Sequence, residues 1–145
     1  MKKLTIDPSA IDLHETIERG VLLHGHLGPF LVAGIRMGLL ALELLDSPGY
    51  FGLEVVSQAG SVTPLSCLND GIQIGSGCTA GKGNLAIIDG KTPRAVFTCG
   101  DRSVEIELRT DVVASFPGSD MIEKSQELET LPLEELFAWK ISPSA

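Results

Sequence analysis

The sequence feature that most constrains the fold is an apolar run from Pro29 to Leu45, in which Arg36 and Glu43 are the only charged residues. Proline suits the first turn of a helix, where its missing N–H has no partner to lose. The run is 17 residues long, at the short limit for a membrane span, and Arg36 lies near its centre. We therefore predict a core helix over 29–45.

Two glycines in this run, Gly34 and Gly38, are four positions apart on one helix face. Small residues at this spacing allow a second backbone to approach closely. The spacing predicts a tight helix–helix contact, which includes the case of a contact across a dimer. A chance occurrence of the pair is the alternative.

Composition indicates one soluble domain over residues 1–145. Hydrophobic residues make up 43% of the chain and charged residues 21%, as in folded proteins. The net charge of -8 argues against binding to nucleic acid or to an anionic membrane surface. The N-terminus has two lysines but no apolar stretch behind them, so we expect no secretory signal.

Three cysteines are present, and no two of them have CxxC spacing. A self-contained zinc finger is therefore excluded. An odd count without a signal sequence is typical of a reducing compartment, and we expect a cytoplasmic protein.

The remaining pattern predicts an α+β domain with two N-terminal helices packed on a mostly antiparallel sheet and C-terminal helices closing it. The first helix is expected to start at Asp7-Pro8-Ser9, to bury Leu13, Ile17 and Val21, and to end at Gly20 or Gly25. Further helices are expected over 64–74, 120–129 and 131–139, and strands over 53–57, 85–88, 95–98 and 104–109. The last strand alternates strictly between apolar and charged residues, as a sheet with one wet face requires.

Two histidines, His24 and His26, immediately precede the apolar helix. A helix N-terminus carries partial positive charge, which favours a neutral imidazole. A neutral imidazole can act as a metal ligand or a base. The alternative is a pair of histidines that only cap and pack a loop.

Cys67 and Cys78 are the cysteines that could join these histidines. Thiolate and imidazole are natural ligands of zinc, so His26, Cys67 and Cys78 form a chemically sensible metal site. Asp70 shares a helix face with Cys67. The alternatives are a cysteine nucleophile activated by a histidine and small buried hydrophobic residues, which is the preferred interpretation for Cys99.

The glycine-rich segment 75–83 contains Lys82 but does not match a P-loop, because three residues separate Gly77 from Gly81 and Gly83 follows the lysine. Successive N–H groups in such a loop can still bind an anion. A solvated lysine in an ordinary loop is the alternative.

Three motifs in order resemble the FmdE-like family, named for one component of formylmethanofuran dehydrogenase. They are His24-Gly-His26-Leu-Gly-Pro29 followed by Gly34-Ile-Arg-Met-Gly38, then Cys67-Leu-Asn-Asp70-Gly-Ile-Gln73, then Gly77-Cys78-Thr79-x-Gly81-Lys82-Gly83-Asn84. The resemblance covers about residues 14 to 110.

The resemblance implies an α+β core that forms a homodimer and has a cleft suited to a divalent metal such as zinc. By position, the metal residues are His24, His26, Cys67 and Cys78, and the ligand-binding residues are Asp70, Thr79 and Lys82. The chain departs from the family pattern at Gly28, where members typically have cysteine. It also ends without the cysteine-rich zinc finger that many members carry.

The function implied is that of a metal- or cofactor-binding accessory protein linked to one-carbon or molybdopterin-type metabolism, with a small anionic ligand or a metabolic enzyme as partner. Two alternatives stay open. One is a small hydrolase or transferase that uses a metal or a cysteine. The other is a structural subunit whose metal site has been lost.

Overall fold

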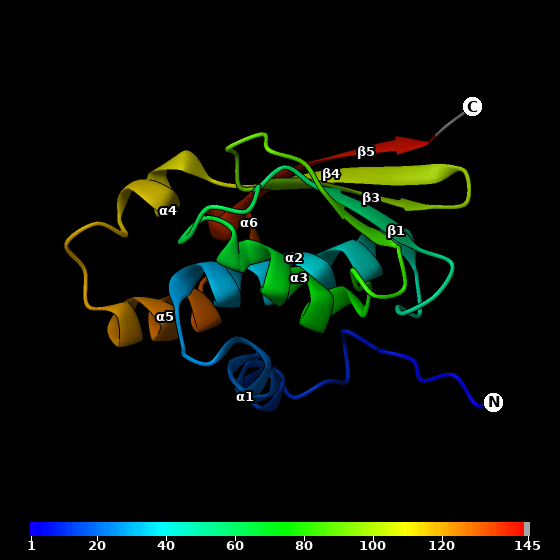
Figure 1. Cartoon of the computed structure of the whole chain (residues 1–145), viewed down its shortest axis with the longest axis horizontal. Coiled ribbons are helices and arrows are strands. Elements are labelled where there is room, and N and C mark those ends of the chain that lie inside the picture. Colours follow the sequence, from blue (N-terminus) through cyan, green and yellow to red (C-terminus); the bar gives the residue numbers. More distant parts are fainter. Residues whose placement is uncertain (144–145) are drawn as a thin grey trace.

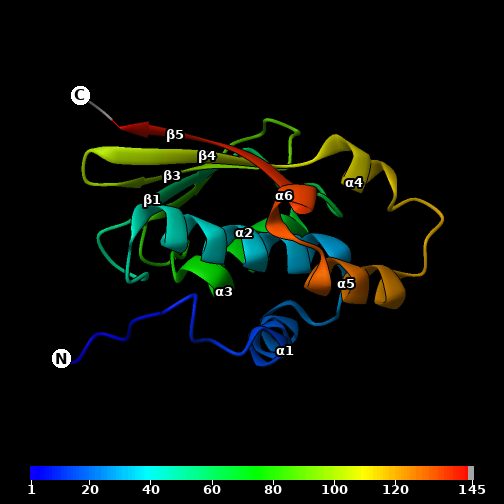
Figure 2. The ribbon, with the colours of Figure 1, turned by 180° about the vertical axis from the view of Figure 1, so that it is seen from behind.

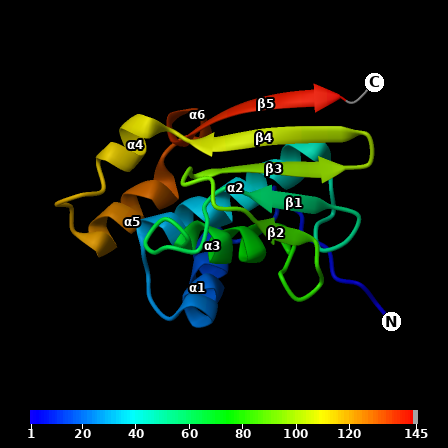
Figure 3. The ribbon, with the colours of Figure 1, turned by 45° about the horizontal axis from the view of Figure 1, so that its top comes forward.

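In the computed structural model, which describes residues 1–143, helices cover one face of a sheet (Figure 1). The strand order is β2-β1-β3-β4-β5, which can be followed from one edge to the other in Figure 3. The strands are β1 (Glu54–Ser57), β2 (Leu85–Ile87), β3 (Arg94–Cys99), β4 (Arg102–Leu108) and β5 (Phe137–Pro143). Only the β1–β2 pair is parallel among the described strands. The predicted α+β class with a mostly antiparallel sheet is confirmed.

The predicted apolar helix is α2 (Pro29–Leu45), and thirteen of its 17 residues are buried. Its central charge, Arg36, is accommodated because the guanidinium Nη1 donates to the carbonyl oxygens of Leu128 and Leu131, at 2.8 and 2.5 Å. Arg36 thereby satisfies carbonyl groups at the end of a C-terminal helix. No helix over residues 1–143 is long and apolar enough to cross a bilayer.

The glycine pair of α2 contacts a helix of the same chain, α3 (Cys67–Ser76). A methyl group added at Gly34 would meet the Leu68 carbonyl oxygen, and one added at Gly38 would lie 2.7 Å from the Ser76 nitrogen. Contacts therefore advance along both helices in the same direction, so α2 and α3 run parallel. Both helices consequently begin at the same end of the molecule.

Helix α1 (Leu13–His24) packs on α2 and α3, on the side away from the sheet (Figure 1). Its predicted start was wrong, because Asp12 is the N-cap and accepts from the Glu15 amide at 3.2 Å. Asp7 instead closes a local turn with Ser9. The helix ends at Gly25, which has a φ of 100° that favours glycine.

The C-terminal part consists of α4 (Thr110–Ala114), α5 (Met121–Thr130), α6 (Leu133–Leu136) and β5 (Figure 2). Helix α4 was not predicted from the sequence. The predicted helix over 131–139 is wrong beyond Leu136, because Phe137 and Trp139 pair with Leu108 and Ile106 of β4. Alternating inward residues at 137, 139 and 141 satisfy the strand period better than a helical one.

Candidate functional site

One cavity of about 310 Å³ lies at the end of the molecule where α2 and α3 begin. The segment from α4 to the start of α5 closes the same end (Figure 3). A volume of this size is at the small end of the range for ligand pockets, roughly 300–1,000 Å³. The cavity is lined by His24, His26, Gly28, Pro29, Phe30, Leu31, Pro64, Cys67, Val113, Phe116, Pro117, Ser119 and Met121.

His24, the last residue of α1, forms an ion pair with Asp70 in the first turn of α3, with Nδ1 2.6 Å from Oδ2. A carboxylate only accepts hydrogen bonds, so Nδ1 carries the proton. The other ring nitrogen, Nε2, is buried and has no hydrogen-bond partner among the described residues. The histidine side chain is 11% exposed. This arrangement leaves a bare lone pair, the form in which imidazole binds a metal or accepts a proton.

His26 lies next to His24, with 4.6 Å between the ring centroids. Its Nδ1 is 3.1 Å from the carbonyl oxygen of Leu27. Since a carbonyl also only accepts, Nδ1 of the neutral ring donates and Nε2 is again left with a lone pair. The connection between α1 and α2 thus presents two imidazoles with the same nitrogen free.

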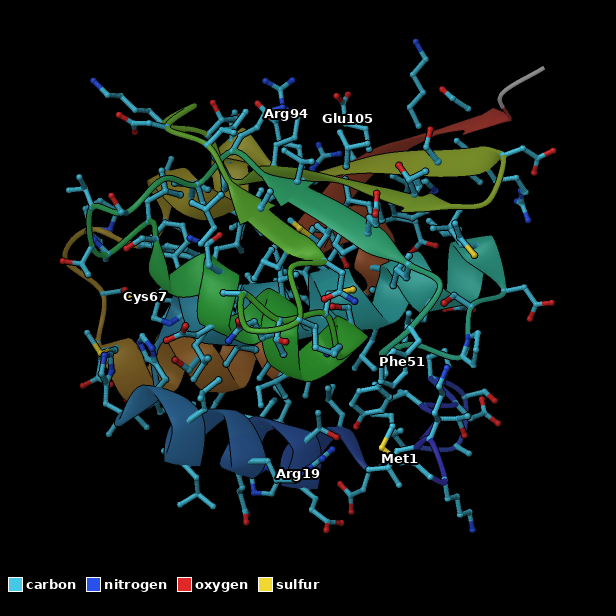
Figure 4. The ribbon with its side chains drawn as sticks, turned by 45° about the vertical axis from the view of Figure 1, so that its right-hand side comes forward. Met1, Arg19, Phe51, Cys67, Arg94 and Glu105 are labelled. Carbon is cyan, nitrogen blue, oxygen red and sulfur yellow. The ribbon has the colours of Figure 1, made fainter. Side chains whose placement is uncertain are left out.

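Cys67, the first residue of α3, brings a thiol to the same cavity. Figure 4 shows it at the end of the molecule where α5 begins, away from Arg19 and Phe51. Burial, and secondarily the Asp70 carboxylate, raises the pKa of the Cys67 thiol above its usual value. The thiol is therefore protonated at neutral pH unless a cation replaces the proton.

Gly28 also lines the cavity, at the position where the family typically has cysteine. Its φ of -156° is extended backbone that any residue adopts. A Cβ at this position would lie 3.3 Å from Cε1 of His26, so a side chain here would point toward the histidines. The departure from the family pattern removes a donor from this cavity and leaves its backbone intact.

Three of the predicted site residues lie elsewhere, beyond the opposite end of α3. The structure does not bring Cys78, Thr79 and Lys82 together with the histidines. Cys78 is buried in the core, with its Sγ 3.6 Å from the Leu53 carbonyl oxygen, and burial raises the pKa of its thiol. At about 1.5 Å per residue, α3 separates it from Cys67 by about 15 Å. A single ion cannot bind both cysteines in this structure.

The donor atoms are therefore present but not yet gathered. Among residues 1–143, no three His, Cys, Asp or Glu side chains already surround one point at metal-binding distance. His24, His26 and Cys67 nevertheless line one cavity, and each has a ligand atom that zinc prefers. The orphaned Nε2 of His24 makes this donor set a fit for a metal whose binding draws the other two side chains in.

The apolar part of the cavity was not foreseen from the sequence. Phe116 packs edge-on against Phe30 of α2, with ring centroids 5.0 Å apart. This contact holds the segment between α4 and α5 over the cavity, where Val113 and Met121 add further apolar surface. A conspicuous Phe-Pro pair at 116–117 was the only local signal, and it says nothing about tertiary position.

Comparison with known proteins places the chain in a family. The model of the FmdE family, described as "Molybdenum formylmethanofuran dehydrogenase operon", matches residues 23–141, so the chain belongs to the FmdE family. A crystal structure of an FmdE-like protein of tungsten formylmethanofuran dehydrogenase, from Syntrophus aciditrophicus, has a TM-score of 0.66 at 14% identity. That match covers 97% of this chain and 77% of the other and establishes the shared fold.

A curated relative is a "probable S-adenosyl-L-methionine-binding protein" of Archaeoglobus fulgidus. It is 29% identical over 106 residues, which are 69% of this chain. The match spans only 28% of that protein's length, so most of the relative lies outside the shared region.

Proposed function

We propose that this chain is a metal-binding accessory protein of the FmdE family, with His24, His26 and Cys67 as the ligands of a zinc ion. The observation that supports this proposal most is the buried His24 Nε2 without a partner among the described residues, held in place by Asp70 on the other ring nitrogen. Histidine ligands of zinc commonly donate their second N–H to a carboxylate in this way. A bound zinc ion would supply a Lewis acid at the polar end of the cavity.

The cysteine-nucleophile alternative receives no comparable support. An activated cysteine has a lowered pKa, usually from a nearby cation. Cys67 instead has a raised pKa, and the carboxylate of Asp70 contributes to the shift. A raised thiol pKa is what a ligand cysteine has before its metal displaces the proton.

Zinc titration of four variants tests the proposal. We expect about one zinc ion per protomer in the native chain, measured by elemental analysis and calorimetry. His24→Ala should weaken binding by more than about 100-fold, and Asp70→Asn by roughly 10- to 100-fold, because Asp70 only orients the ring. Lys82→Ala, beyond the opposite end of α3, is the matched control and should bind zinc normally.

The decisive outcome is a folded native chain that takes up no zinc. That result would remove the metal-binding function and favour a structural subunit whose metal site has been lost. Equal loss in His24→Ala and Lys82→Ala would instead mean that the ions bind the surface and not the cavity.

The proposal includes a homodimer that works alongside a metabolic enzyme, in the one-carbon or molybdopterin setting for which the family is named. Figure 4 shows Arg94 and Glu105 projecting from the sheet face opposite the helices. This face carries the Arg94–Glu107 ion pair. Light scattering of the untagged chain tests the dimer independently of zinc.

A further inference from the structure

The chemistry of the cavity changes sharply from its floor to its wall. The donor atoms of His24, His26 and Cys67 are at one end. The rest is contributed mainly by prolines, phenylalanines, Leu31, Val113 and Met121. A ligand that fills this space needs a polar head at the floor and an apolar body against the wall, because apolar surface gains free energy only against apolar surface.

The lining contains no Lys, Arg, Asp or Glu among its described residues. A buried charge without a partner loses several kcal/mol, in rough terms, relative to water. Phosphate esters, carboxylates and ammonium groups would therefore enter without a counter-charge from the wall. The anionic ligand expected from the sequence rested on Lys82, which does not line this cavity.

The floor also favours a neutral head. If zinc binds as proposed, its two positive charges are balanced by the thiolate of Cys67 and the carboxylate of Asp70, which contacts His24. Phe30 and Leu31 contribute the first N–H groups of α2, which lack partners within the helix. No side chain caps this helix end. An uncharged oxygen atom satisfies these donors without adding a net charge.

We propose that the cavity binds a small, uncharged organic molecule with an apolar body and a single hydroxyl or carbonyl head directed at the His24, His26 and Cys67 floor. The inference rests on the proposed function, because the zinc ion is part of the charge balance. It excludes dinucleotides, phosphorylated cofactors and S-adenosyl-L-methionine as occupants of this cavity, since all of them carry charges that the wall cannot pair.

Three probes of the same shape test the ligand class on zinc-loaded protein. Benzyl alcohol is neutral, benzoate is an anion and benzylamine is a cation. We expect benzyl alcohol to bind at least about tenfold more tightly than either charged probe, measured by ligand-observed NMR and calorimetry. Phe116→Ala should weaken benzyl alcohol by about tenfold through lost apolar contact.

A charge placed on the wall should reverse the preference. Met121→Lys puts an ammonium group at the cavity and should raise benzoate affinity above that of benzyl alcohol. Ile122→Lys is the matched control: its side chain is 58% exposed, it does not line the cavity, and it should leave the order of the probes unchanged. Thermal unfolding of each variant establishes that it is folded.

The outcomes separate this inference from the proposed function. If zinc binds but benzoate matches or exceeds benzyl alcohol in the native chain, the uncharged class is wrong and the metal site stands. Failure of all three probes to bind zinc-loaded protein also overturns the inference. Absence of zinc binding overturns the metal function itself, and with it the charge balance on which the inference rests.

Discussion

At its first turn α3 presents Cys67 and Asp70 to the cavity, and beyond its last residue it is followed by Cys78 and the glycine loop that carries Lys82. The ammonium of Lys82 donates to the Gly77 carbonyl at 2.6 Å and lies 3.2 Å from Thr79 Oγ1. The Thr79 amide donates to the Asn84 side chain at 2.9 Å. These polar groups have partners within the loop itself.

The first end of α3 differs because its polar groups are held but not satisfied. Asp70 positions His24, yet the Nε2 of that ring stays buried without a partner among the described residues. An unpaired buried polar atom costs roughly 1–3 kcal/mol. Residue types alone made both ends candidate sites, whereas partner satisfaction distinguishes a loop that stabilises itself from a cavity that awaits a ligand.

The largest expected effect comes from breaking the contact that holds both ends of α3 in place. A methyl group at Gly34 would meet the Leu68 carbonyl oxygen and lie 2.9 Å from Gly71 Cα. Since backbone cannot turn aside, Gly34→Ala should lower the free energy of unfolding by about 3 kcal/mol. Urea denaturation measures this change.

Gly81→Ala is the control for that substitution, because nothing lies within 4 Å of a Cβ at position 81. It should change the free energy of unfolding by less than about 0.5 kcal/mol. Equal stabilities for the two alanine variants would show that α2 and α3 are not packed through these glycines.

The next effect sharpens the contrast by adding a donor only at the cavity. Gly28→Cys places a thiol where a Cβ would lie 3.3 Å from the His26 ring. We expect zinc affinity to rise at least about tenfold, because thiolate is a strong zinc ligand. Calorimetry against Gly28→Ser separates the thiol from its bulk, and unchanged affinity would place position 28 outside the metal site.

The two cysteines should also differ in how pH affects zinc binding. The raised pKa of the Cys67 thiol, caused first by burial and then by Asp70, means that zinc must displace a proton. Above about pH 7, where histidines are mostly neutral, affinity should rise by about tenfold per pH unit. Cys67→Ala should flatten this dependence, whereas Cys78→Ala should retain it; the same slope in both variants would contradict the assignment.

Much of the scaffold could be predicted because its signals are local. The apolar run gave α2 with its observed bounds, and the alternation at 104–108 gave the wet face of β4. The helix start at Asp7 and the helix over 137–139 were wrong for a different reason. Both segments contain acceptable helix signals, and tertiary contacts decided between competing local options, with β4 taking Phe137 as a strand partner.

The candidate site was predictable only in part, since a cavity is a tertiary object. Nothing in the neighbourhood of Val113, Phe116 or Met121 indicates that they face His24. The separation of Cys67 from Cys78, however, followed from the predicted helix over 64–74. Eleven residues of mostly helical chain place their ends about 15 Å apart, so a metal site with both cysteines conflicted with the secondary structure expected between them.

The smallest expected effect concerns a polar contact that needs no ligand, between α1 and α5. His14 Nδ1 is 3.1 Å from Glu129 Oε2, and its Nε2 is 3.1 Å from Glu18 Oε1. The hydrogen bond and charge of Glu129 raise the pKa of His14 above its usual 6.5. A histidine with a raised folded pKa stabilises the fold fully below its unfolded pKa, and this contribution disappears as pH rises through the folded pKa. His14→Gln should therefore lower stability slightly near pH 6 and leave it unchanged near pH 9, values chosen to bracket about pH 6.5. Because α1 carries His14 at one end and His24 at the other, zinc affinity should not change, and a variant that lost zinc would show that the distant end of α1 also positions the cavity.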